Sequence, residues 1–421
     1  MAVVIFALKA YLVLVISILV VYSIRHFIFT VNRVSGEQRL FYQDIVDSDL
    51  PSVSVLVPMH NEENVARQGI EAILRSDYPL DRFEIIPIND HSTDGTGDLL
   101  MQISRDHKNV KPLHRNNGKR GKPAGLNDAL QVAVGDIVIV FDADYIPGKG
   151  TLRDLAVSFK NPEVGAVMGR VVPMNTNKSL LARILELERS GGYQVDQQAR
   201  YNLSLIPQYG GTVGGFRREL MLALGGFDPK VLAEDTDLTY RLVINGWKVV
   251  YANRVECYEE VPQTWAVRSR QIRRWARGHN QAMFKNFWPL LKSPYLRLRE
   301  KIDGALLLLI YTIPVFLLFG IADSIALFFL GEMAIAHSLA IFILVAGYNA
   351  FGNFAPFYQI GTAYLLDGVT YRICLLPFLL FYFLLNLWNT GLGLYDALAD
   401  NLSRRERKWA KTRRFRKESM Q

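Results

Sequence analysis

The sequence predicts an α/β domain held between membrane-spanning helices. Three observations predict it: strands alternate with helices from about residue 50, long apolar segments lie on both sides, and polar clusters follow the strands. The chain, with 421 residues and 50% hydrophobic content, exceeds one ordinary domain. We expect a spanning helix in 1–31, the α/β domain in 50–260, interfacial helices in 261–301, spanning helices in 302–395 and a basic tail in 396–421.

Residues 2–31 form one long apolar segment. A signal peptide is the alternative, but no short apolar core precedes a clear small-residue cleavage site, so we predict an uncleaved span. The second apolar block divides near Gly331, between 347 and 356, and near Asp367. This division predicts four crossings with a short third one, although residues 353–366 fit a re-entrant or interfacial segment as well.

The net charge of +8 is unevenly distributed. Residues 263–301 carry ten Lys and Arg against one Glu, and residues 401–421 carry nine against two. Such segments beside spans favour the cytosolic side and attract anionic lipids. Nucleic-acid binding is the rival explanation, but no nucleic-acid motif accompanies them. We therefore expect an integral protein of the cell (inner or plasma) membrane whose α/β domain is cytosolic and whose partners include membrane lipids but no nucleic acid.

Buried strands are predicted at Val53–Val57, Phe83–Ile88 and Asp136–Phe141. A helix is predicted at Val65–Ser76, and another strand–helix unit after Asn109. This alternation implies a parallel sheet covered by helices on both faces. Ligands of such sheets bind beyond the carboxyl ends of the strands, where the polar clusters of this sequence lie. We therefore expect these clusters to form one site.

Asp142 and Asp144 directly follow a predicted strand. Two carboxylates separated by one residue can approach one divalent cation, Mg²⁺ or Mn²⁺, which also accepts phosphate oxygens and water. Such a cation would neutralise charge developing on a diphosphate leaving group.

Two further clusters suit a nucleotide. Asp90–Asp94 offers carboxylates and hydroxyls for a base and ribose, although an Asx turn capping a helix is the alternative. Asn117–Lys122, with Leu126-Asn127, is a glycine-spaced basic loop suited to diphosphate, although it could be a solvated surface loop. Its spacing is not that of a P-loop, so ATP hydrolysis is not predicted.

Asp235 is the candidate general base, because a placed carboxylate can accept the proton of an attacking hydroxyl. Its neighbours Glu234 and Asp237 are acidic as well, and one of the three could only cap the helix predicted at Leu238–Asn245.

Gln271, Arg274 and Trp275 fall on one face of a helix predicted over Trp265–Trp288. Arg can hold phosphate oxygens with two hydrogen bonds, and Trp offers a flat surface to a sugar. An interfacial helix with ordinary anchoring residues is the alternative. Ser179–Arg200 has an amphipathic period that fits a domain-packing helix or an interfacial one equally. Four glycines in Tyr209–Phe216 allow a ligand to approach the backbone closely.

Taken together, these motifs resemble the processive family 2 glycosyltransferases, which include the cellulose, hyaluronan, chitin and poly-N-acetylglucosamine synthases. The matching segments follow the family's order: Val57–Glu62, Asp90–Asp94, Lys119–Asn127, Asp142–Asp144, Gly210–Arg217, Glu234-Asp235 and Gln271–Trp275 with Ala276-Arg277-Gly278. The sequence departs from the family at Ala233, where many members carry Thr, and lacks the Phe-Cys-Gly pattern of cellulose synthases within Gly211–Gly215.

The resemblance implies a GT-A-like fold, inverting chemistry and dependence on Mg²⁺ or Mn²⁺. Asp142 and Asp144 would hold the metal, Asp235 would be the base, and Gln271, Arg274 and Trp275 would hold diphosphate and acceptor. The remaining substrate-binding residues implied are Pro58, Asn61, Glu62, Asp90, Lys119, Lys122, Asp142, Gly214 and Glu234.

Three hypotheses follow. The first is transfer of a hexose or N-acetylhexosamine from a UDP-sugar to a growing β-linked polysaccharide, with export through the spans. The second is a non-processive transfer of one sugar to a lipid, so the acceptor is a polysaccharide or a glycolipid. The third is a catalytically silent membrane protein that binds a sugar nucleotide or partner subunits. Whether the chain acts with a partner subunit or as a homo-oligomer is left open by the sequence.

Overall fold

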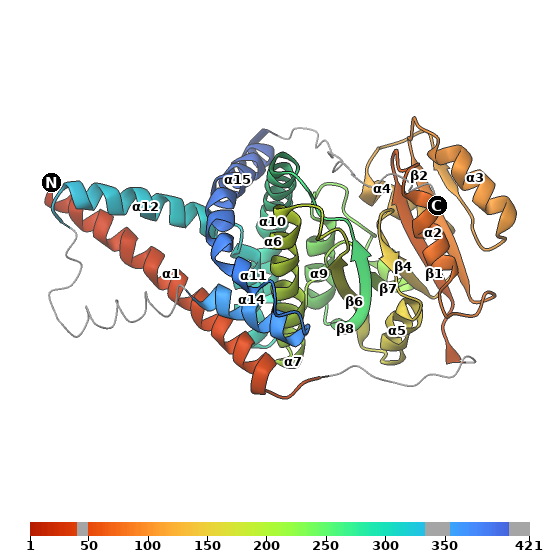
Figure 1. Cartoon of the computed structure of the whole chain (residues 1–421), viewed down its shortest axis with the longest axis horizontal. Helices are drawn as coiled ribbons and strands as arrows, with labels where there is room; N and C mark the ends of the chain where they lie inside the picture. The colour runs from red at the N-terminus through yellow and green to blue at the C-terminus, as the bar shows by residue number, and fades with distance from the viewer. Residues whose placement is uncertain (40–48, 333–353, 404–421) are drawn as a thin grey trace.

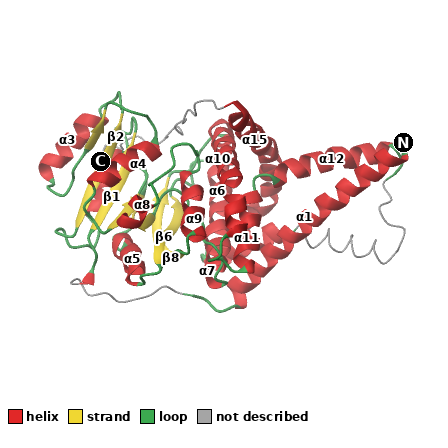
Figure 2. Cartoon of the chain, turned by 180° about the vertical axis from the view of Figure 1, so that it is seen from behind, coloured by secondary structure: helices red, strands yellow, loops and turns green. Residues whose placement is uncertain are grey.

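The computed structural model describes residues 1–39, 49–332 and 354–403. A mixed sheet forms one end of the molecule, and α1 and α12 extend from the opposite end (Figure 1). Helices α6, α10, α11 and α15 lie between these two parts, as the view from behind also shows (Figure 2). The molecule therefore passes from an α/β domain, through a layer of helices, to an apolar helical extension.

Within the described residues, the sheet has eight strands in the order β3-β2-β1-β4-β7-β6-β8-β5. Neighbouring strands are parallel from β3 to β4, as predicted, whereas β7 is antiparallel to both β4 and β6. Strand β7 follows both β4 and β6 in the chain yet lies between them in the sheet, which strand–helix alternation does not reveal. The strands are β1 (Val53–Met59), β2 (Phe83–Asp90), β3 (Leu113–Arg115), β4 (Ile137–Val140), β5 (Ile146–Pro147), β6 (Val164–Pro173), β7 (Gly214–Arg217) and β8 (Lys248–Glu259).

The sheet is buried on both faces. Successive side chains of a strand point to opposite sides, so each strand contributes to the hydrophobic cores on both faces. In β1, Val55 and Val57 belong to one hydrophobic core and Leu56 to the other. The domain's helices are α2 (Ala66–Leu74), α3 (Thr96–Asp106), α4 (Lys122–Val132), α5 (Thr151–Val157), α6 (Leu180–Ser190), α7 (Gln198–Asn202), α8 (Arg218–Ala223) and α9 (Glu234–Ile244), with a 3-10 turn at Ser158–Lys160. A second 3-10 turn, Ile373–Leu375, directly precedes α15 (Leu376–Ser403).

Helix α6 packs against other helices rather than lying free. Leu181, Ile184 and Leu187 are buried in a cluster with α14 (Ala355–Leu366) and α15 (Leu376–Ser403). This observation agrees with the domain-packing interpretation of Ser179–Arg200. The predicted helix does not run uninterrupted, because Gly191–Gln197 forms a π-helical segment between α6 and α7. Segments of this kind occur frequently at functional sites.

Asp196, in this π-helical segment, belongs to a closed ring of four charged groups. Arg25 contacts Asp196 at 3.2 Å and Asp303 at 2.7 Å, and Arg200 contacts the same two carboxylates at 3.0 and 2.9 Å. The ring joins α1 (Ala2–Ser35), the π-helical segment, α7 and α11 (Leu298–Leu309). Two positive and two negative charges therefore neutralise one another where the apolar helices meet the domain.

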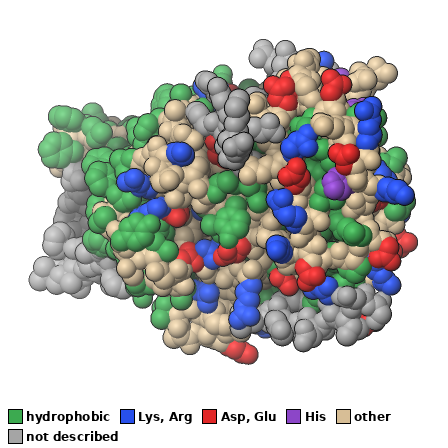
Figure 3. Space-filling model, turned by 45° about the vertical axis from the view of Figure 1, so that its right-hand side comes forward, with side chains coloured by type: hydrophobic (Ala, Val, Ile, Leu, Met, Phe, Trp, Pro, Cys, Tyr) green, Lys and Arg blue, Asp and Glu red, His purple; other side chains and the backbone are tan. Residues whose placement is uncertain are grey.

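Two described helices are long and apolar enough to cross a membrane: Ala2–Ser35 and Ile373–Asn401. A third candidate is the pair formed by α11 and α12 (Ile313–Phe329), which is bent by 65° at the break between them. Hydrophobic side chains gather toward this end of the molecule, whereas charged side chains are spread over the α/β domain (Figure 3). Helix α1 is antiparallel to the bent pair, since Lys9 contacts Glu332 at 2.7 Å and the Tyr22 hydroxyl donates to the Leu306 carbonyl.

Helix α14 has 12 residues and is about 18 Å long, which is too short to cross the roughly 30 Å hydrocarbon layer. It packs against the domain: the Tyr364 hydroxyl donates to Glu186, and Asp367, just beyond α14, pairs with Arg170 at 2.7 Å. This arrangement fits the re-entrant or interfacial alternative for residues 353–366. Part of the predicted division lies in 333–353, outside the described residues, so the count of four spans stays a prediction.

Helix α10 (Trp265–Lys292) is fastened to α15 by two ion pairs one turn apart. Arg273 binds Asp396 with two hydrogen bonds of 2.6 and 2.8 Å, and Arg277 binds Asp400 with two of 2.7 and 2.6 Å. Gln281 also donates to Asp400. The predicted helix at Trp265–Trp288 is thus confirmed, and its position depends on the last described helix.

Candidate active site

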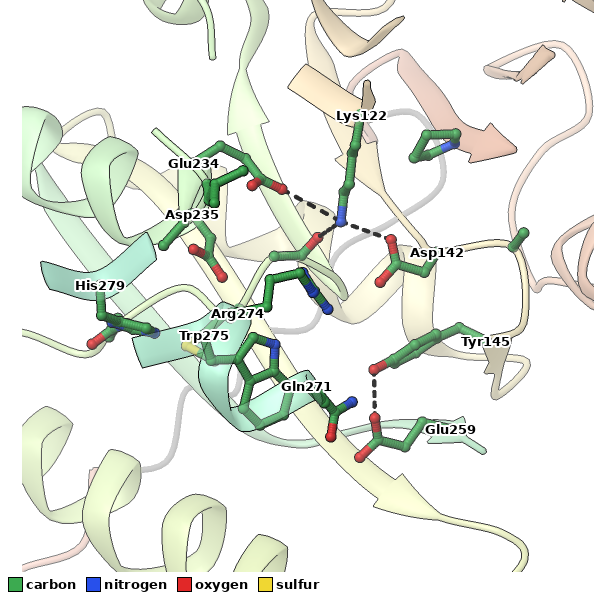
Figure 4. Close-up of a pocket in the computed structure, with 18 of the residues that line it drawn as sticks. Lys122, Asp142, Tyr145, Glu234, Asp235, Glu259, Gln271, Arg274, Trp275 and His279 are labelled. Carbon is green, nitrogen blue, oxygen red and sulfur yellow. Dashed lines mark hydrogen bonds and ion pairs between the residues drawn. The ribbon is translucent and has the colours of Figure 1, made fainter. Parts of the chain in front are cut away.

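A cavity of about 380 Å³ opens beyond the carboxyl ends of β1, β2 and β4. Its volume lies within the range of small-molecule sites. Pro58, Glu62 and Asp90 line it from the ends of β1 and β2, and Asp142 lines it from the end of β4. Helices α9 and α10 contribute the opposite walls (Figure 4). Predicted residues at the strand ends therefore line one cavity, as the strand-end rule led us to expect.

The Lys122 ammonium group lies at the centre of the polar half. It contacts Asp142 at 2.7 Å, the Gly211 carbonyl at 2.7 Å and Glu234 at 3.6 Å (Figure 4). Burial alone would lower the pKa of Lys122, but the carboxylates of Asp142 and Glu234 raise it above its ordinary value. Lys122 therefore carries a firm positive charge among carboxylates contributed by two distant parts of the chain.

Asp90 organises the basic loop that precedes α4. Its carboxylate binds the Arg115 guanidinium and accepts a hydrogen bond of 2.7 Å from the Gly121 amide. Arg115 in turn donates to the Lys119 carbonyl at 2.9 Å. Lys122 reaches the cavity, but Lys119 does not line it. Only one of the two predicted lysines of this loop thus lines the cavity, because Asp90 fixes the backbone between them.

Three other predicted residues lie away from the cavity wall. Asn61 accepts a hydrogen bond of 2.7 Å from the Thr93 amide and braces the loop after β2. Gly214 lies within β7, where a Cβ atom would meet the Tyr209 ring at 2.2 Å, so its small size serves packing. Asp144 is fully buried beside the cavity, and only its partner Asp142 faces it. A turn after β4 sends the two carboxylates to different environments.

Glu234 and Asp235 begin α9, which starts four residues before the helix predicted at Leu238–Asn245, and both line the cavity. Burial raises the pKa of both carboxyl groups; the Lys122 charge opposes the rise at Glu234, and the Thr236 amide, Lys122 and Arg274 oppose it at Asp235. The Thr236 amide donates to Asp235 Oδ1 at 2.7 Å. At Gly211, whose φ is +82°, a Cβ atom would lie 3.0 Å from Asp235 Oδ2, so the glycine leaves room beside the carboxylate.

Gln271, Arg274 and Trp275 enter the cavity from one face of α10, as predicted (Figure 4). The Trp275 ring is flanked by two guanidinium groups, those of Arg268 at 5.0 Å and Arg189 at 5.2 Å. Arg268 also donates to the Gln271 side-chain oxygen at 2.6 Å. Cation–π contacts and this hydrogen bond hold the motif in one orientation.

Sequence reasoning missed a second group of lining residues. Glu259, at the end of β8, accepts hydrogen bonds from the Tyr145 hydroxyl at 2.7 Å and from Arg189 at 2.6 Å. His279 is stacked on Tyr311, and burial lowers its pKa to about 4. Glu259 ends β8 and Glu260 follows it, so the strand-end rule that pointed to Asp142 could have pointed to them as well. His279 falls one turn after Trp275 on α10, a signal too weak to single it out.

The apolar helices α11 and α12 contribute a further wall of the cavity. Leu307, Ile310 and Tyr311, at the bend between α11 and α12, line the same cavity as Asp142 and Lys122. Tyr193 and Gln197 line it from the π-helical segment. One cavity therefore spans the strand ends, the motif-bearing helix and the membrane-type helices.

The same region matches a known family. The family model described as "Glycosyltransferase like family 2" matches residues 51–278, more than half of the chain. The chain belongs to the family 2 glycosyltransferases. It is 32% identical over 373 residues to "Probable glycosyltransferase YdaM" of Bacillus subtilis, covering 87% of this chain and 88% of that protein. The expected enzyme class is thereby confirmed, whereas the processive type stays a prediction.

Two further similarities bear on fold and acceptor. "Beta-monoglucosyldiacylglycerol synthase" of a Nostoc species is 29% identical over 275 residues, covering 65% of this chain and 58% of that protein. The structure of a mannosyltransferase from Pyrobaculum calidifontis, in complex with GDP-Man and Mn²⁺, superposes with a TM-score of 0.63 at 22% identity, covering 95% of this chain and all of that one. The expected GT-A-like fold is thus confirmed, with a mixed sheet in place of a wholly parallel one.

Proposed function

We propose that this glycosyltransferase transfers a single sugar from a nucleotide diphosphate sugar to a hydroxyl group of a membrane lipid. The observation that carries the proposal is the composition of the cavity, in which strand-end charges face residues of the bend between α11 and α12. A sugar nucleotide is charged and soluble, whereas a lipid headgroup reaches the cavity from the membrane side. The relative from Nostoc, named for glucosyldiacylglycerol synthesis, supports a lipid acceptor.

The donor's diphosphate would lie near Lys122 and Asp142. Lys122 supplies a positive charge, and Asp142 is the member of the Asp142/Asp144 pair whose carboxylate faces the cavity. Mg²⁺ typically takes one or two protein carboxylates together with substrate phosphates and water, so Asp142 fits as a ligand of a donor-bound ion. No group of three or more His, Cys, Asp or Glu side chains within the described residues could hold an ion by itself. A bound divalent cation would neutralise charge on the departing diphosphate.

Asp235 would act as the base. Its carboxylate accepts the proton of the acceptor hydroxyl while the hydroxyl oxygen bonds to the anomeric carbon, and the bond from that carbon to the diphosphate oxygen breaks. Attack opposite the leaving group inverts the configuration. Arg274 and Lys122 favour the ionised carboxylate that this step needs, since both charges lower the raised pKa of Asp235. The Trp275 face would support the acceptor or transferred sugar.

Purified protein in lipid bilayers, supplied with labelled UDP- and GDP-sugars, tests this function. We expect one labelled product that is extracted with lipids and carries one sugar. A labelled polymer would overturn single transfer and favour the processive alternative, which the family's polymer-forming members suggest. Removal of divalent ions with EDTA should abolish transfer, and Mg²⁺ or Mn²⁺ should restore it; full activity in EDTA would remove the proposed role of Asp142 as a metal ligand.

The proposed orientation places the cavity on the cytosolic side, where sugar nucleotides are made. The basic residues of 263–301 support it, because positive charge beside spans favours the cytosol. Labelling of single cysteines introduced into α3, with a reagent that does not cross the membrane, tests the orientation. Labelling in intact cells without permeabilisation would contradict it.

A further inference from the structure

A second cavity, of about 390 Å³, lies where α1 and α11 meet the α/β domain, and it shares no lining residue with the first. Its lining begins at Arg39, shortly after the end of α1, and includes residues 295–300 around the start of α11. The sheet side contributes Trp247 and Lys248. Neither the family motifs nor the proposed reaction uses this cavity.

The charged lining of the second cavity is strongly unbalanced. Four basic residues line it, Arg39, Lys248, Arg297 and Arg299, against the single carboxylate of Glu300. Lys248 pairs with Glu163, and Glu300 accepts from the Arg297 amide as a helix cap. Neither Arg297 nor Arg299 forms an ion pair with another residue that the structure describes. Two exposed arginines therefore line a cavity whose one carboxylate is already engaged.

Apart from Asn161 and Ser204, the uncharged side chains of the lining are mostly apolar or aromatic. Leu205, Ile206 and Leu296 contribute aliphatic surface, and Trp247 and Tyr295 contribute aromatic rings. Aromatic rings of this amphipathic kind concentrate at the boundary between lipid and water. Positive charge above apolar surface suits a ligand that is anionic at one end and apolar at the other.

The position of the cavity along α1 points to the lipid headgroup level. Helix α1 is antiparallel to the α11–α12 pair, and its contacts run from Lys9 with Glu332 to Arg25 with Asp303. Beyond Arg25, the exposed apolar surface of α1 continues through Val34. The cavity begins where that surface ends. If α1 crosses the bilayer, phospholipid phosphates lie beside Arg39, Arg297 and Arg299.

We propose that this cavity binds the phosphate headgroup of an anionic phospholipid, apart from the acceptor and donor. Arg297 and Arg299 would donate to the phosphate oxygens, and Trp247 and Tyr295 would contact the glycerol and upper acyl region. Guanidinium groups bind phosphate with paired hydrogen bonds, which makes arginine well suited to this contact. Such a lipid would join the end of α1 to the start of α11.

The test compares lipid retention by protein in nanodiscs of phosphatidylcholine containing a minor fraction of phosphatidylglycerol. Native mass spectrometry after release counts the bound phosphatidylglycerol, without donor or acceptor, so failure of the proposed sugar transfer does not affect the result. The cavity variant is Arg297→Gln/Arg299→Gln. The matched control is Arg105→Gln/Lys108→Gln, which removes the same charge from exposed positions in and just after α3.

We expect the cavity variant to lose at least about tenfold in affinity for phosphatidylglycerol, since hydrogen bonds to charged groups are worth more than one tenfold step. The control should bind as the wild-type protein does. Equal losses in both variants would indicate a general charge effect and overturn the site, as would no loss in either. Displacement of the lipid by inorganic phosphate at millimolar concentration would assign the site to a soluble anion instead.

Discussion

Asp400→Asn should destabilise the protein several times more than Asp396→Asn, although each substitution removes one carboxylate charge from α15. Both aspartates bind an arginine of α10 with two hydrogen bonds of nearly the same length. They differ in burial: the side chains of Arg273 and Asp396 are 46% and 20% exposed, and those of Arg277 and Asp400 are 25% and 6% exposed.

The expected magnitudes follow from this difference. Exposed ion pairs contribute about 0.2–1 kcal/mol, so Asp396→Asn should cost less than about 1 kcal/mol. Breaking a buried pair leaves a charge uncompensated and costs about 3–5 kcal/mol. Asp400→Asn should fall near the lower end, about 3 kcal/mol, because Arg277 is partly exposed. The Gln281 donor would also lose its carboxylate acceptor.

Thermal unfolding of both variants in the same detergent, followed by intrinsic fluorescence, measures the difference. The midpoint shift of Asp400→Asn should be at least about three times that of Asp396→Asn. The double variant Arg277→Met/Asp400→Asn should be more stable than Asp400→Asn alone, because no guanidinium is then left unpaired. Equal shifts for the two single variants, or no recovery in the double variant, would refute the reasoning from burial.

Three further outcomes follow from the cavity. Asp235→Asn should reduce transfer at least about 100-fold, because the base is lost. It should also raise the thermal midpoint at neutral pH: burial raises the pKa of Asp235 above 3.8, so the stability gained from its protonated form is lost as pH rises. An unchanged or lower midpoint would contradict this reasoning. Transfer should fall as pH is lowered through that raised pKa. His279→Gln should keep this acidic limb, because burial against Tyr311 lowers the pKa of His279, whereas burial raises the pKa of Asp235; loss of the limb in the variant would reassign it. Asp196→Asn should raise the acceptor KM while leaving the donor Kd unchanged, because Asp196 lies between the cavity-lining residues Tyr193 and Gln197. Glu84→Gln, which breaks the contact of a buried carboxylate with the exposed Lys111 at the far end of β2, should change neither. Loss of donor binding in Asp196→Asn would show general damage instead.

The sequence predicted the site because its polar clusters obey a topological rule. Asp90, Asp142 and Pro58 lie at the ends of parallel strands, and such ends meet at one edge of a sheet. Joining Asp235 and Trp275 to that edge needed a known family's order of motifs, since no local pattern states which helix returns to the sheet.

The remaining features depend on tertiary contacts that the sequence does not contain. Asp142 and Asp144 look equivalent in sequence, and only the path of the chain after β4 separates a cavity-facing carboxylate from a buried one. Gly214 resembles a ligand-binding glycine until Tyr209 is seen against it. Strand β7 lies between β4 and β6 and runs antiparallel to both, although it follows them in the chain. This insertion depends on contacts between distant segments.

The π-helical segment Gly191–Gln197 contacts both the candidate active-site cavity and the apolar helix α1. Tyr193 and Gln197 border the reaction chamber, while Asp196 is tied to arginines of α1 and α7. On the proposed function, the acceptor side of the cavity would therefore depend on the packing of α1 beside the π-helical segment. Insertion of α1 into the membrane would then precede catalysis, and protein left in water would not consume the cell's sugar nucleotides.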